Sequence, residues 1–362
     1  MEKKKVAVIS SYACIVNYNN YGALLQYYAL QTYLKKNGIF AYWIRYVLED
    51  ENTFTYKLKK QIKQIVHPKY YLFNILCSHY FKQFIIQNLN VSKKKYVGDY
   101  YIKKMPPKAD YYVTGSDQVW AGTLRANYLH FVKDDTKKIA YAVSFGANQI
   151  TQEHKSIIKP WVSKFEHISV REVTGISICD SIGKKAIQLL DPTLLIDRVD
   201  YPFSTNMSTD VFCYFTNIKN VLEIHLLEIK AFCREQNLKF KIASIQGNEF
   251  YFSLKDLVFP SPEEWLGYYN SAKYIITNTF HGTVFAIIFK KPFITILQKG
   301  ISKEQNCRII SLLNMFGLQE RIYKVEESID SQLIRPINWS LVDKSISEYR
   351  ILSDIFFKES IL

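Results

Sequence analysis

The chain has 362 residues, of which 48% are hydrophobic and 15% aromatic, and its formal net charge at pH 7 is +14. Such an apolar composition excludes a disordered or low-complexity protein, and the length is sufficient for two domains of ordinary size. The six cysteines are widely spaced, without a CxxC pair or a zinc-like cluster with histidine. We therefore expect reduced thiols, no metal site and a cytoplasmic location. The longest apolar runs are far too short to cross a membrane.

Strand and helix patterns alternate along the first half of the chain. Apolar runs predict strands at residues 4–10, 39–47, 109–114, 137–146 and 167–172. A helix is expected over residues 23–36, because Ala23, Tyr27 and Leu30 recur on one helical face. A second helix is predicted over residues 151–165.

The same alternation continues after about residue 210. The predicted strands are 211–217, 239–245, 274–277 and 292–297, and the predicted helices are 221–236, 261–272, 281–290, 304–317 and 340–360. One helix has clear start signals, with Ser261 as N-cap, Pro262 at the first position and Glu264 at the third. Alternating elements in two successive halves predict an α/β protein of two Rossmann-like, doubly wound domains with parallel sheets.

We expect an N-terminal domain over residues 1–203, a C-terminal domain over 204–340 and a last helix over 341–362. A lysine-rich insertion at about 57–108 interrupts the first domain and is predicted to be mainly helical. Ligands of such folds bind at the carboxyl ends of the strands, so the loops at these ends should carry the chemistry.

The insertion carries twelve lysines and one acidic residue, Asp99, and therefore a net charge of +11. Aromatic residues lie among the lysines, including Tyr70, Tyr71, Phe73, Tyr80, Phe81, Phe84 and Tyr100. One interpretation is a solvated helical hairpin with tyrosines packed beneath it. Another is attraction to an anionic membrane or a phosphate-bearing lipid substrate, to which each basic group near the surface contributes about 1 kcal/mol. Nucleic acid is the least favoured partner, because no nucleic-acid-binding motif accompanies the lysines.

The loop after the first strand leads into a helix through Asn17, Tyr21 and Gly22. Free backbone N–H groups and the helix dipole make such a helix start favourable for an anion. The stretch is neither a GxGxxG fingerprint nor a P-loop, so it gives no support to nucleotide binding.

Polar residues also follow the third and fifth predicted strands. Ser116, Asp117 and Gln118 form a polar surface after one of them, and the alternative interpretation is that Ser116 or Asp117 caps a following helix. Arg171 ends the other strand. It could pair with Glu172 or another acid, or it could bind a carboxylate or phosphate, which the guanidinium fork suits.

The stretch NTFHG separates a predicted buried strand from a very apolar helix. Asn278 and Thr279 follow the strand, and His281 and Gly282 begin the helix. A lone histidine is more often structural than catalytic, but this one lies at the positive end of a helix, beside a glycine that permits close backbone approach. The combination predicts a bound phosphate or carboxylate with the histidine next to it.

Five motifs in a fixed order carry a family resemblance: TGSDQVW, AVSFG, SVRE, LDPTLLI and ITNTFHGTVFAIIFKKPF. Together they resemble the polysaccharide pyruvyl transferase family over nearly the whole chain, with the lysine-rich insertion as the weakest match. The resemblance implies a glycosyltransferase-B-like fold, with the site in the cleft between two Rossmann-like domains and a last helix crossing back to the first. It also implies transfer of pyruvate from phosphoenolpyruvate to two hydroxyls of a sugar, as a cyclic ketal, in a capsule or exopolysaccharide precursor.

This chemistry needs an acid, a base and clamps for the anionic groups of the donor. His281 is the candidate for phosphate contact and proton transfer, and Asp117 is the candidate base. Some family members carry, two residues before the histidine, an arginine that binds the donor, where this chain has Thr279. Arg171 and Arg308 are the candidates to replace that cation. The other predicted donor ligands are Asn278, Thr279 and Gly282, and the predicted acceptor or cleft residues are Asn17, Tyr21, Gly22, Ser116 and Gln118.

The resemblance implies no cofactor beyond phosphoenolpyruvate as co-substrate, and a sugar acceptor that is lipid-linked, nucleotide-linked or polymeric. Together with the insertion, it suggests a peripheral position at the inner face of the cell membrane. Two alternatives stay open. A sugar-nucleotide-dependent glycosyltransferase of the same fold would release nucleotide rather than phosphate, and a non-catalytic polysaccharide assembly protein would use the insertion for docking alone.

Overall fold

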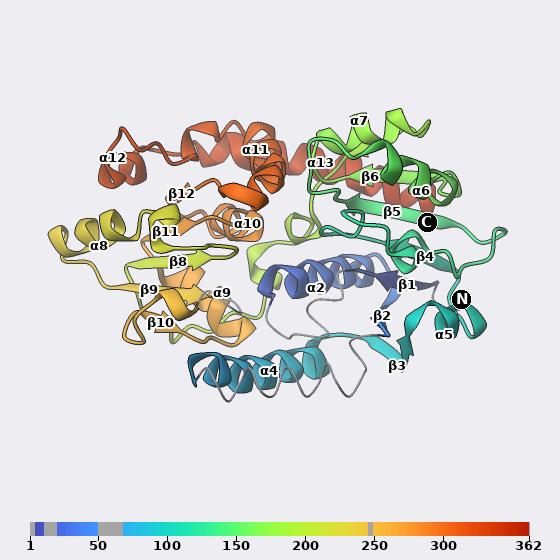
Figure 1. The fold of residues 1–362 in the computed structure, drawn as a ribbon, viewed down its shortest axis with the longest axis horizontal. Helices are drawn as coiled ribbons and strands as arrows, with labels where there is room; N and C mark the ends of the chain where they lie inside the picture. Colours follow the sequence, from blue (N-terminus) through green and yellow to red (C-terminus); the bar gives the residue numbers. More distant parts are fainter. Residues whose placement is uncertain (1–3, 11–19, 50–67, 245–248, 362) are drawn as a thin grey trace. The chain divides into compact units, whose positions relative to one another are not determined.

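The computed structural model describes residues 4–10, 20–49, 68–244 and 249–361, drawn as a ribbon in Figure 1. These residues form two compact units: unit 1 within Met1–Gln61, Ile85–Ile196 and Ile346–Leu362, and unit 2 within Ile62–Phe84 and Asp197–Ser345. Each unit contains one parallel sheet and its own hydrophobic core.

Seven parallel strands form the sheet of unit 1, in the order β3-β2-β1-β4-β5-β6-β7. They are β1 (Lys5–Ile9), β2 (Phe40–Val47), β3 (Val91–Val97), β4 (Tyr111–Thr114), β5 (Lys138–Val143), β6 (His167–Val170) and β7 (Ile187–Gln188). In β1, Val6, Ala7 and Val8 are all fully buried, as expected for a central strand of a parallel sheet. β1 pairs with β2 on one side, Val6 with Ala41, and with β4 on the other, Val6 with Tyr111. The direction of strand addition therefore reverses between β1 and β4, and such a switch point is where folds of this type bind ligands.

The two helices predicted for unit 1, at 23–36 and 151–165, are present within three residues of their predicted bounds, and the structure adds a helix at Thr174–Ser181 that was not predicted. The helices of this unit are α2 (Tyr21–Lys36), α5 (Gly98–Lys104), α6 (Gln152–Val162) and α7 (Thr174–Ser181), while α4 (Pro68–Asn88) runs from the range of unit 2 into that of unit 1. The side chain of Asn20 caps α2 by accepting the N–H of Ala23 at 3.0 Å. The helix ends at Asn37, followed by Gly38 with a φ of 76°, a backbone conformation that glycine adopts readily.

The lysine-rich insertion differs from the prediction, which made it mainly helical. It contains β3, an edge strand of the main sheet, in which Tyr96 pairs with Tyr46 of β2. Because of the three consecutive lysines 93–95, the sequence lacks the alternation of polar and apolar residues expected of a strand. All three lysines are exposed in β3, and charged side chains of this kind protect a sheet edge from pairing with another strand. The segments α4 and α5 are helical as expected, and residues 57–67 lie outside the described part of the chain.

Unit 2 repeats the architecture with five parallel strands, in the order β10-β9-β8-β11-β12. The strands are β8 (Val211–Phe215), β9 (Phe240–Ser244), β10 (Leu257–Val258), β11 (Tyr274–Thr277) and β12 (Phe293–Thr295), and the helices are α8 (Leu226–Glu235), α9 (Pro262–Ser271), α10 (Phe280–Ile288), α11 (Asn306–Met315) and α12 (Ile329–Ile334). The predicted capping box of α9 is confirmed, because Ser261 and Glu264 each accept the backbone N–H of the other, at 3.1 and 2.8 Å. The switch point of this sheet lies between β8 and β11.

The last helix, α13 (Trp339–Ser360), carries the chain from unit 2 back to unit 1. Within unit 1, Arg350 donates hydrogen bonds to the carbonyls of Leu194 and Ile196 at 2.7 and 2.8 Å. The hydroxyl of Ser353 lies 3.2 Å from that of Tyr141 in β5. These contacts confirm the predicted return of the C-terminal helix. None of the helices in the described ranges combines the length and apolar character needed to span a bilayer.

Candidate functional site

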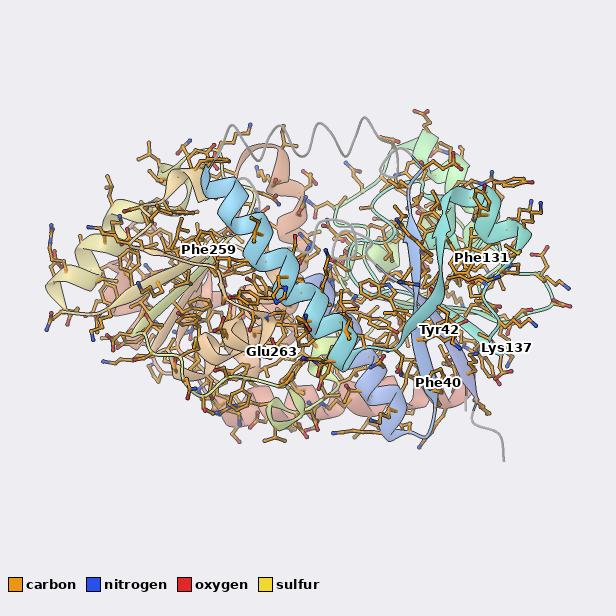
Figure 2. All side chains as sticks on the ribbon, turned by 90° about the horizontal axis from the view of Figure 1, so that it is seen from below. Phe40, Tyr42, Phe131, Lys137, Phe259 and Glu263 are labelled. Carbon is orange, nitrogen blue, oxygen red and sulfur yellow. The ribbon has the colours of Figure 1, made fainter. Side chains whose placement is uncertain are left out.

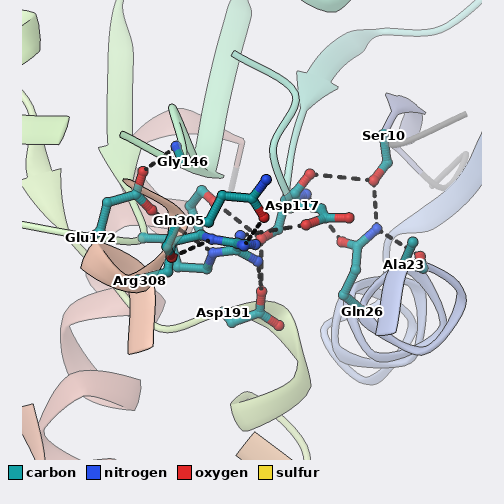
Figure 3. Close-up of polar contacts among 12 residues, drawn as sticks. Ser10, Ala23, Gln26, Asp117, Gly146, Glu172, Asp191, Gln305 and Arg308 are labelled. Carbon is teal, nitrogen blue, oxygen red and sulfur yellow. Dashed lines mark hydrogen bonds and ion pairs between the residues drawn. The ribbon is translucent and has the colours of Figure 1, made fainter. Parts of the chain in front are cut away.

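A buried glutamine joins the two loops at the switch point of unit 1 (Figure 3). Gln26, on α2, accepts the backbone N–H of Ser116 at 3.1 Å. Its amide nitrogen donates to the hydroxyl of Ser10 at 2.5 Å and to the carbonyl of Ala23 at 3.0 Å. The ends of β1 and β4 are therefore held together by side chains rather than by the sheet alone.

The loop after β4 is a turn, so the interpretation of Ser116 or Asp117 as a helix N-cap is wrong. The hydroxyl of Ser116 lies 2.9 Å from the carboxylate of Asp191 and 3.0 Å from the carbonyl of Ala142. Asp117 has a φ of 62°, and its carbonyl accepts the N–H groups of Val119 and Ser144. Aspartate tolerates this left-handed conformation better than most residues, and such positions cluster at functional sites.

Arg171, at the end of β6, is buried among three carboxylates. Its guanidinium lies 3.0 Å from Asp191, 3.4 Å from Asp117 and 3.9 Å from Glu172. Burial alone would lower the pKa of Arg171, but Asp191, Asp117 and Glu172 outweigh it and raise the pKa. The residues of three predicted motifs thus meet at one edge of the sheet, around a single cation.

Asp117 is the least buried of the three carboxylates in this group. Its side chain is 11% exposed, whereas those of Glu172 and Asp191 are fully buried. Glu172 accepts the backbone N–H groups of Phe145 and Gly146 at 2.8 and 3.0 Å. The other oxygen of Asp191 accepts hydrogen bonds from the backbone N–H and the hydroxyl of Thr193. Two of the carboxylates therefore hold the loops, and the third, Asp117, is slightly exposed.

The remaining predicted residues of unit 1 lie near this edge to different degrees. Tyr21 and Gly22 form the buried first turn of α2. The amide nitrogen of Gln118 lies where a side chain on Gly146 would begin, 2.1 Å from that Cβ position. Asn17 falls outside the described residues, so nothing is assigned to it.

At the switch point of unit 2, the side chains form an amide network. Asn278, after β11, accepts the backbone N–H of Thr216 at 2.9 Å and donates to its carbonyl at 2.8 Å. Gln298 donates to the carbonyl of Asn278 at 3.0 Å. Asn306, in turn, makes two hydrogen bonds of 2.9 Å with the backbone of Gln298. Asn278 therefore joins the loops after β8, β11 and β12.

The stretch after Asn278 starts helix α10 through a threonine cap. The hydroxyl of Thr279 accepts the N–H of Gly282 at 2.8 Å and lies 3.1 Å from the hydroxyl of Thr277. A Cβ on Gly282 would lie 2.1 Å from the Thr277 hydroxyl and 2.5 Å from that of Thr279. The glycine is thus required for close packing of the helix start on the end of β11.

His281 and Arg308 both belong to helix starts in unit 2. His281 is buried in the first turn of α10, with its ring edge-on to that of Phe280 at a centroid distance of 5.1 Å. Arg308, in the first turn of α11, donates to the carbonyl of Gln305 at 3.1 Å and to its side chain at 2.8 Å. In unit 2, these residues bring an imidazole and a guanidinium to the amino ends of two helices.

Sequence reasoning missed the residues that organise both edges. Asp191 lies within a motif that carried the resemblance, but no role was predicted for it. Gln26 had a detectable signal, because it is a polar residue on the fully apolar side of a helix. Gln298 and Asn306 had none, since an amide near a strand end is common and its partners are distant in the chain. Among the described residues, no group of three or more His, Cys, Asp or Glu side chains is arranged to hold a metal ion.

Comparison with solved structures supports the fold. One match is a Staphylococcus aureus MnaA–UDP co-structure, with a TM-score of 0.53 and 11% identity over 99% of this chain and 98% of that chain. A UDP-GlcNAc 2-epimerase from Neisseria meningitidis bound to UDP-GlcNAc gives a TM-score of 0.49 and 11% identity over 98% and 100% of the two chains. At this identity, the first similarity concerns the fold alone. It agrees with the two parallel sheets in confirming the predicted glycosyltransferase-B-like class.

Sequence comparison decides the family. No curated protein sequence matches the chain. The sequence profile of the polysaccharide pyruvyl transferase family, however, matches residues 20–299. This range contains the buried Arg171 cluster of unit 1 and the NTFHG stretch of unit 2, and it covers well over half of the chain. The chain therefore belongs to the polysaccharide pyruvyl transferase family.

Proposed function

We propose that this protein transfers pyruvate from phosphoenolpyruvate to two hydroxyls of a sugar in a cell-surface polysaccharide precursor. The product is a cyclic ketal, and phosphate is released. Family membership supports pyruvyl transfer to a polysaccharide. The observation that carries the assignment of roles is the Arg171 cluster, in which the partly exposed carboxylate of Asp117 is paired with the buried Arg171.

The reaction requires one proton to be added and two to be removed. Protonation of C3 of phosphoenolpyruvate makes C2 electrophilic, and His281 is the proposed donor of this proton. A sugar hydroxyl attacks C2 and loses its proton to Asp117, the proposed base. The second hydroxyl then attacks C2, the C–O bond to phosphate breaks, and the departing phosphate takes the last proton.

We assign the acceptor sugar to unit 1. Three carboxylates surround a single guanidinium there, so this edge is acidic and repels the carboxylate and phosphate of the donor. A neutral sugar carries no such charge, and its hydroxyls can donate hydrogen bonds to Asp117. The predicted acceptor residues Ser116 and Gln118 flank this carboxylate in the chain.

We assign the donor to unit 2. Arg308 is on its helix α11, and the exposed Lys219 and Lys299 follow β8 and β12. The ammonium group of Lys219 lies 3.9 Å from the Cβ position of Gly300, so the loops that carry the two lysines approach each other. These cations would replace the arginine that some family members carry at the place of Thr279. The guanidinium of Arg171 already lies close to three carboxylates. Arg171 is therefore better suited to positioning Asp117 than to binding the donor.

The activity can be tested directly. The protein is incubated with phosphoenolpyruvate and a panel of lipid-linked and nucleotide-linked sugars, and phosphate release and ketal formation are followed together. Phosphate release that depends on one class of acceptor is expected. Release of nucleotide from a sugar nucleotide without consumption of phosphoenolpyruvate would instead identify a glycosyltransferase.

Donor binding has a separate readout. A ligand present at 100 times its dissociation constant stabilises the folded protein by about 2.7 kcal/mol, so phosphoenolpyruvate should raise the melting temperature. Arg308→Ala should abolish this rise while leaving the melting temperature without ligand nearly unchanged. The matched control is Arg234→Ala, an exposed arginine on α8. Full protection of the Arg308 variant would place the donor elsewhere.

A further inference from the structure

Unit 1 has a pocket that none of the preceding chemistry uses. Its volume is about 380 Å³. It lies at the amino ends of β1 and β2 and along β3, whereas the Arg171 cluster lies at the carboxyl ends of the strands. Figure 2 shows two of its aromatic residues, Phe40 and Tyr42, which project from the same face of β2 with their ring centroids 6.4 Å apart. The lining residues are Lys5, Phe40, Tyr42, Val91, Ser92, Lys93, Lys94, Tyr96, Pro107 and Lys108.

Four lysines give this pocket a positive charge. Its four lysines are exposed and come from three separate parts of the chain. Within the part of the chain that the structure describes, none of their ammonium groups forms an ion pair. The ammonium of Lys5 lies 5.2 Å from the ring centre of Tyr42. The neighbouring Asp110 accepts the backbone N–H of Lys5 at 2.7 Å and is not part of the lining.

From the pocket, a basic and aromatic surface continues along the edge strand β3. The ammonium of Lys94 lies 3.9 Å from the sulfur of Met105, and that of Lys104 lies 5.6 Å from the ring centre of Tyr100. Tyr100 and Tyr101 are 62% and 55% exposed. This surface thus combines lysines with exposed aromatic and apolar side chains, a combination typical of proteins that lie on membranes.

The one acid of the lysine-rich insertion, Asp99, interacts with side chains outside the insertion. Asp99 accepts a hydrogen bond from the hydroxyl of Tyr46 at 2.9 Å and lies 3.9 Å from His130. An anionic surface approaching the β3 edge would meet the exposed lysines 93–95 of that strand.

We propose that this surface docks on an anionic phospholipid bilayer, with the phosphate of one lipid headgroup seated in the pocket. The exposed tyrosines would insert at the headgroup level, and the lysines would attract the negative leaflet. The inference is independent of pyruvyl transfer. It narrows the predicted attraction of the whole lysine-rich insertion to one edge of unit 1, and it adds Lys5, which lies outside the insertion.

The test is sedimentation with vesicles of phosphatidylcholine alone or mixed with phosphatidylglycerol. Binding should require the anionic lipid and fall steeply with salt, since screening shortens the reach of exposed charge to about 8 Å at physiological ionic strength. Lys94→Glu combined with Lys108→Glu should weaken binding by about 30-fold or more, since each basic group contributes about 1 kcal/mol. Tyr100→Ser combined with Tyr101→Ser should weaken binding without changing its salt dependence.

The matched control is Lys159→Glu combined with Lys185→Glu. These exposed lysines belong to the same unit and change the net charge by the same amount, so they should leave binding nearly intact. An equal loss in both lysine pairs would overturn the proposal, because binding would then follow net charge alone. Binding to phosphatidylcholine that equals binding to the mixture would also overturn it. Binding to inorganic phosphate or single-stranded DNA without any binding to vesicles would overturn it as well.

Discussion

The two units differ at the same place in their sheets. At the switch point of unit 1, Arg171 is buried among carboxylates, and the loops are held mainly by charged groups. At the switch point of unit 2, Asn278, Gln298 and Asn306 hold the loops with neutral amides, and a threonine caps the following helix. The same topology is therefore stabilised by two kinds of polar chemistry.

This difference suggests that the neutral sugar and the anionic donor bind to different units. An acidic edge disfavours an anion, and a neutral edge with nearby cations accepts one. A single residue from each edge faces the chemistry in the proposal, Asp117 in unit 1 and His281 in unit 2. If the comparison is correct, substitutions at the two edges should fail in different ways.

The largest expected effect is on turnover at the acidic edge. Asp117→Asn removes the proposed base, so phosphate release should fall by about 10²–10⁴-fold. Stability should change little, because the cluster has more carboxylates than cations and Arg171 keeps two partners. The control is Asp180→Asn, an exposed aspartate on α7. If the Asp117→Asn variant keeps activity close to that of the unmodified protein, Asp117 is not the base.

At the neutral edge, His281 should also be required for turnover. His281→Ala and His281→Asn should both lose about 10²–10⁴-fold, because asparagine keeps a hydrogen-bond donor but cannot transfer a proton. If the asparagine variant keeps most of the activity, phosphate contact is the main role instead. Retained activity in both, with lower stability of the alanine variant, would make His281 a core residue.

Stability should depend most on the cation of unit 1. Arg171→Met leaves buried carboxylates without a counter-charge, and breaking such a pair costs about 3–5 kcal/mol. Urea denaturation measures the free energy of unfolding, and adding Asp191→Asn to the variant should restore part of it. A loss of activity without any loss of stability would show that Arg171 acts on a substrate rather than on the carboxylates.

The smallest effect is expected at the helix start of unit 2. Gly282→Ala introduces a Cβ into the space of the Thr277 and Thr279 hydroxyls. Such overpacking typically costs about 1–3 kcal/mol, to be measured as a lower free energy of unfolding. Addition of Thr277→Ser, which removes a methyl but keeps the hydroxyl, should not rescue the variant, whereas Thr277→Ala should recover part of the loss. Unchanged stability with weaker donor binding would favour the predicted role of Gly282 in ligand approach.

Several local features were predictable because their signals are short in sequence. The capping signals of α9, the end of α2 at Asn37 and Gly38, and the buried parallel strands each depend on residues within one or two turns of the chain. β3 was not predicted, because its signal is not local. Three consecutive lysines fit a strand only at the edge of a sheet, and the sequence alone does not show which strand lies at an edge.

The sequence by itself determined the alternation of strands and helices, the family, and the loops in which the polar residues lie. Only the tertiary structure decided which of those residues meet. Arg171, Asp117 and Asp191 are distant in the chain and become neighbours because parallel strands end at one edge. Whether an arginine binds a ligand or a buried carboxylate depends on the charges around it, and these charges are brought together only by folding.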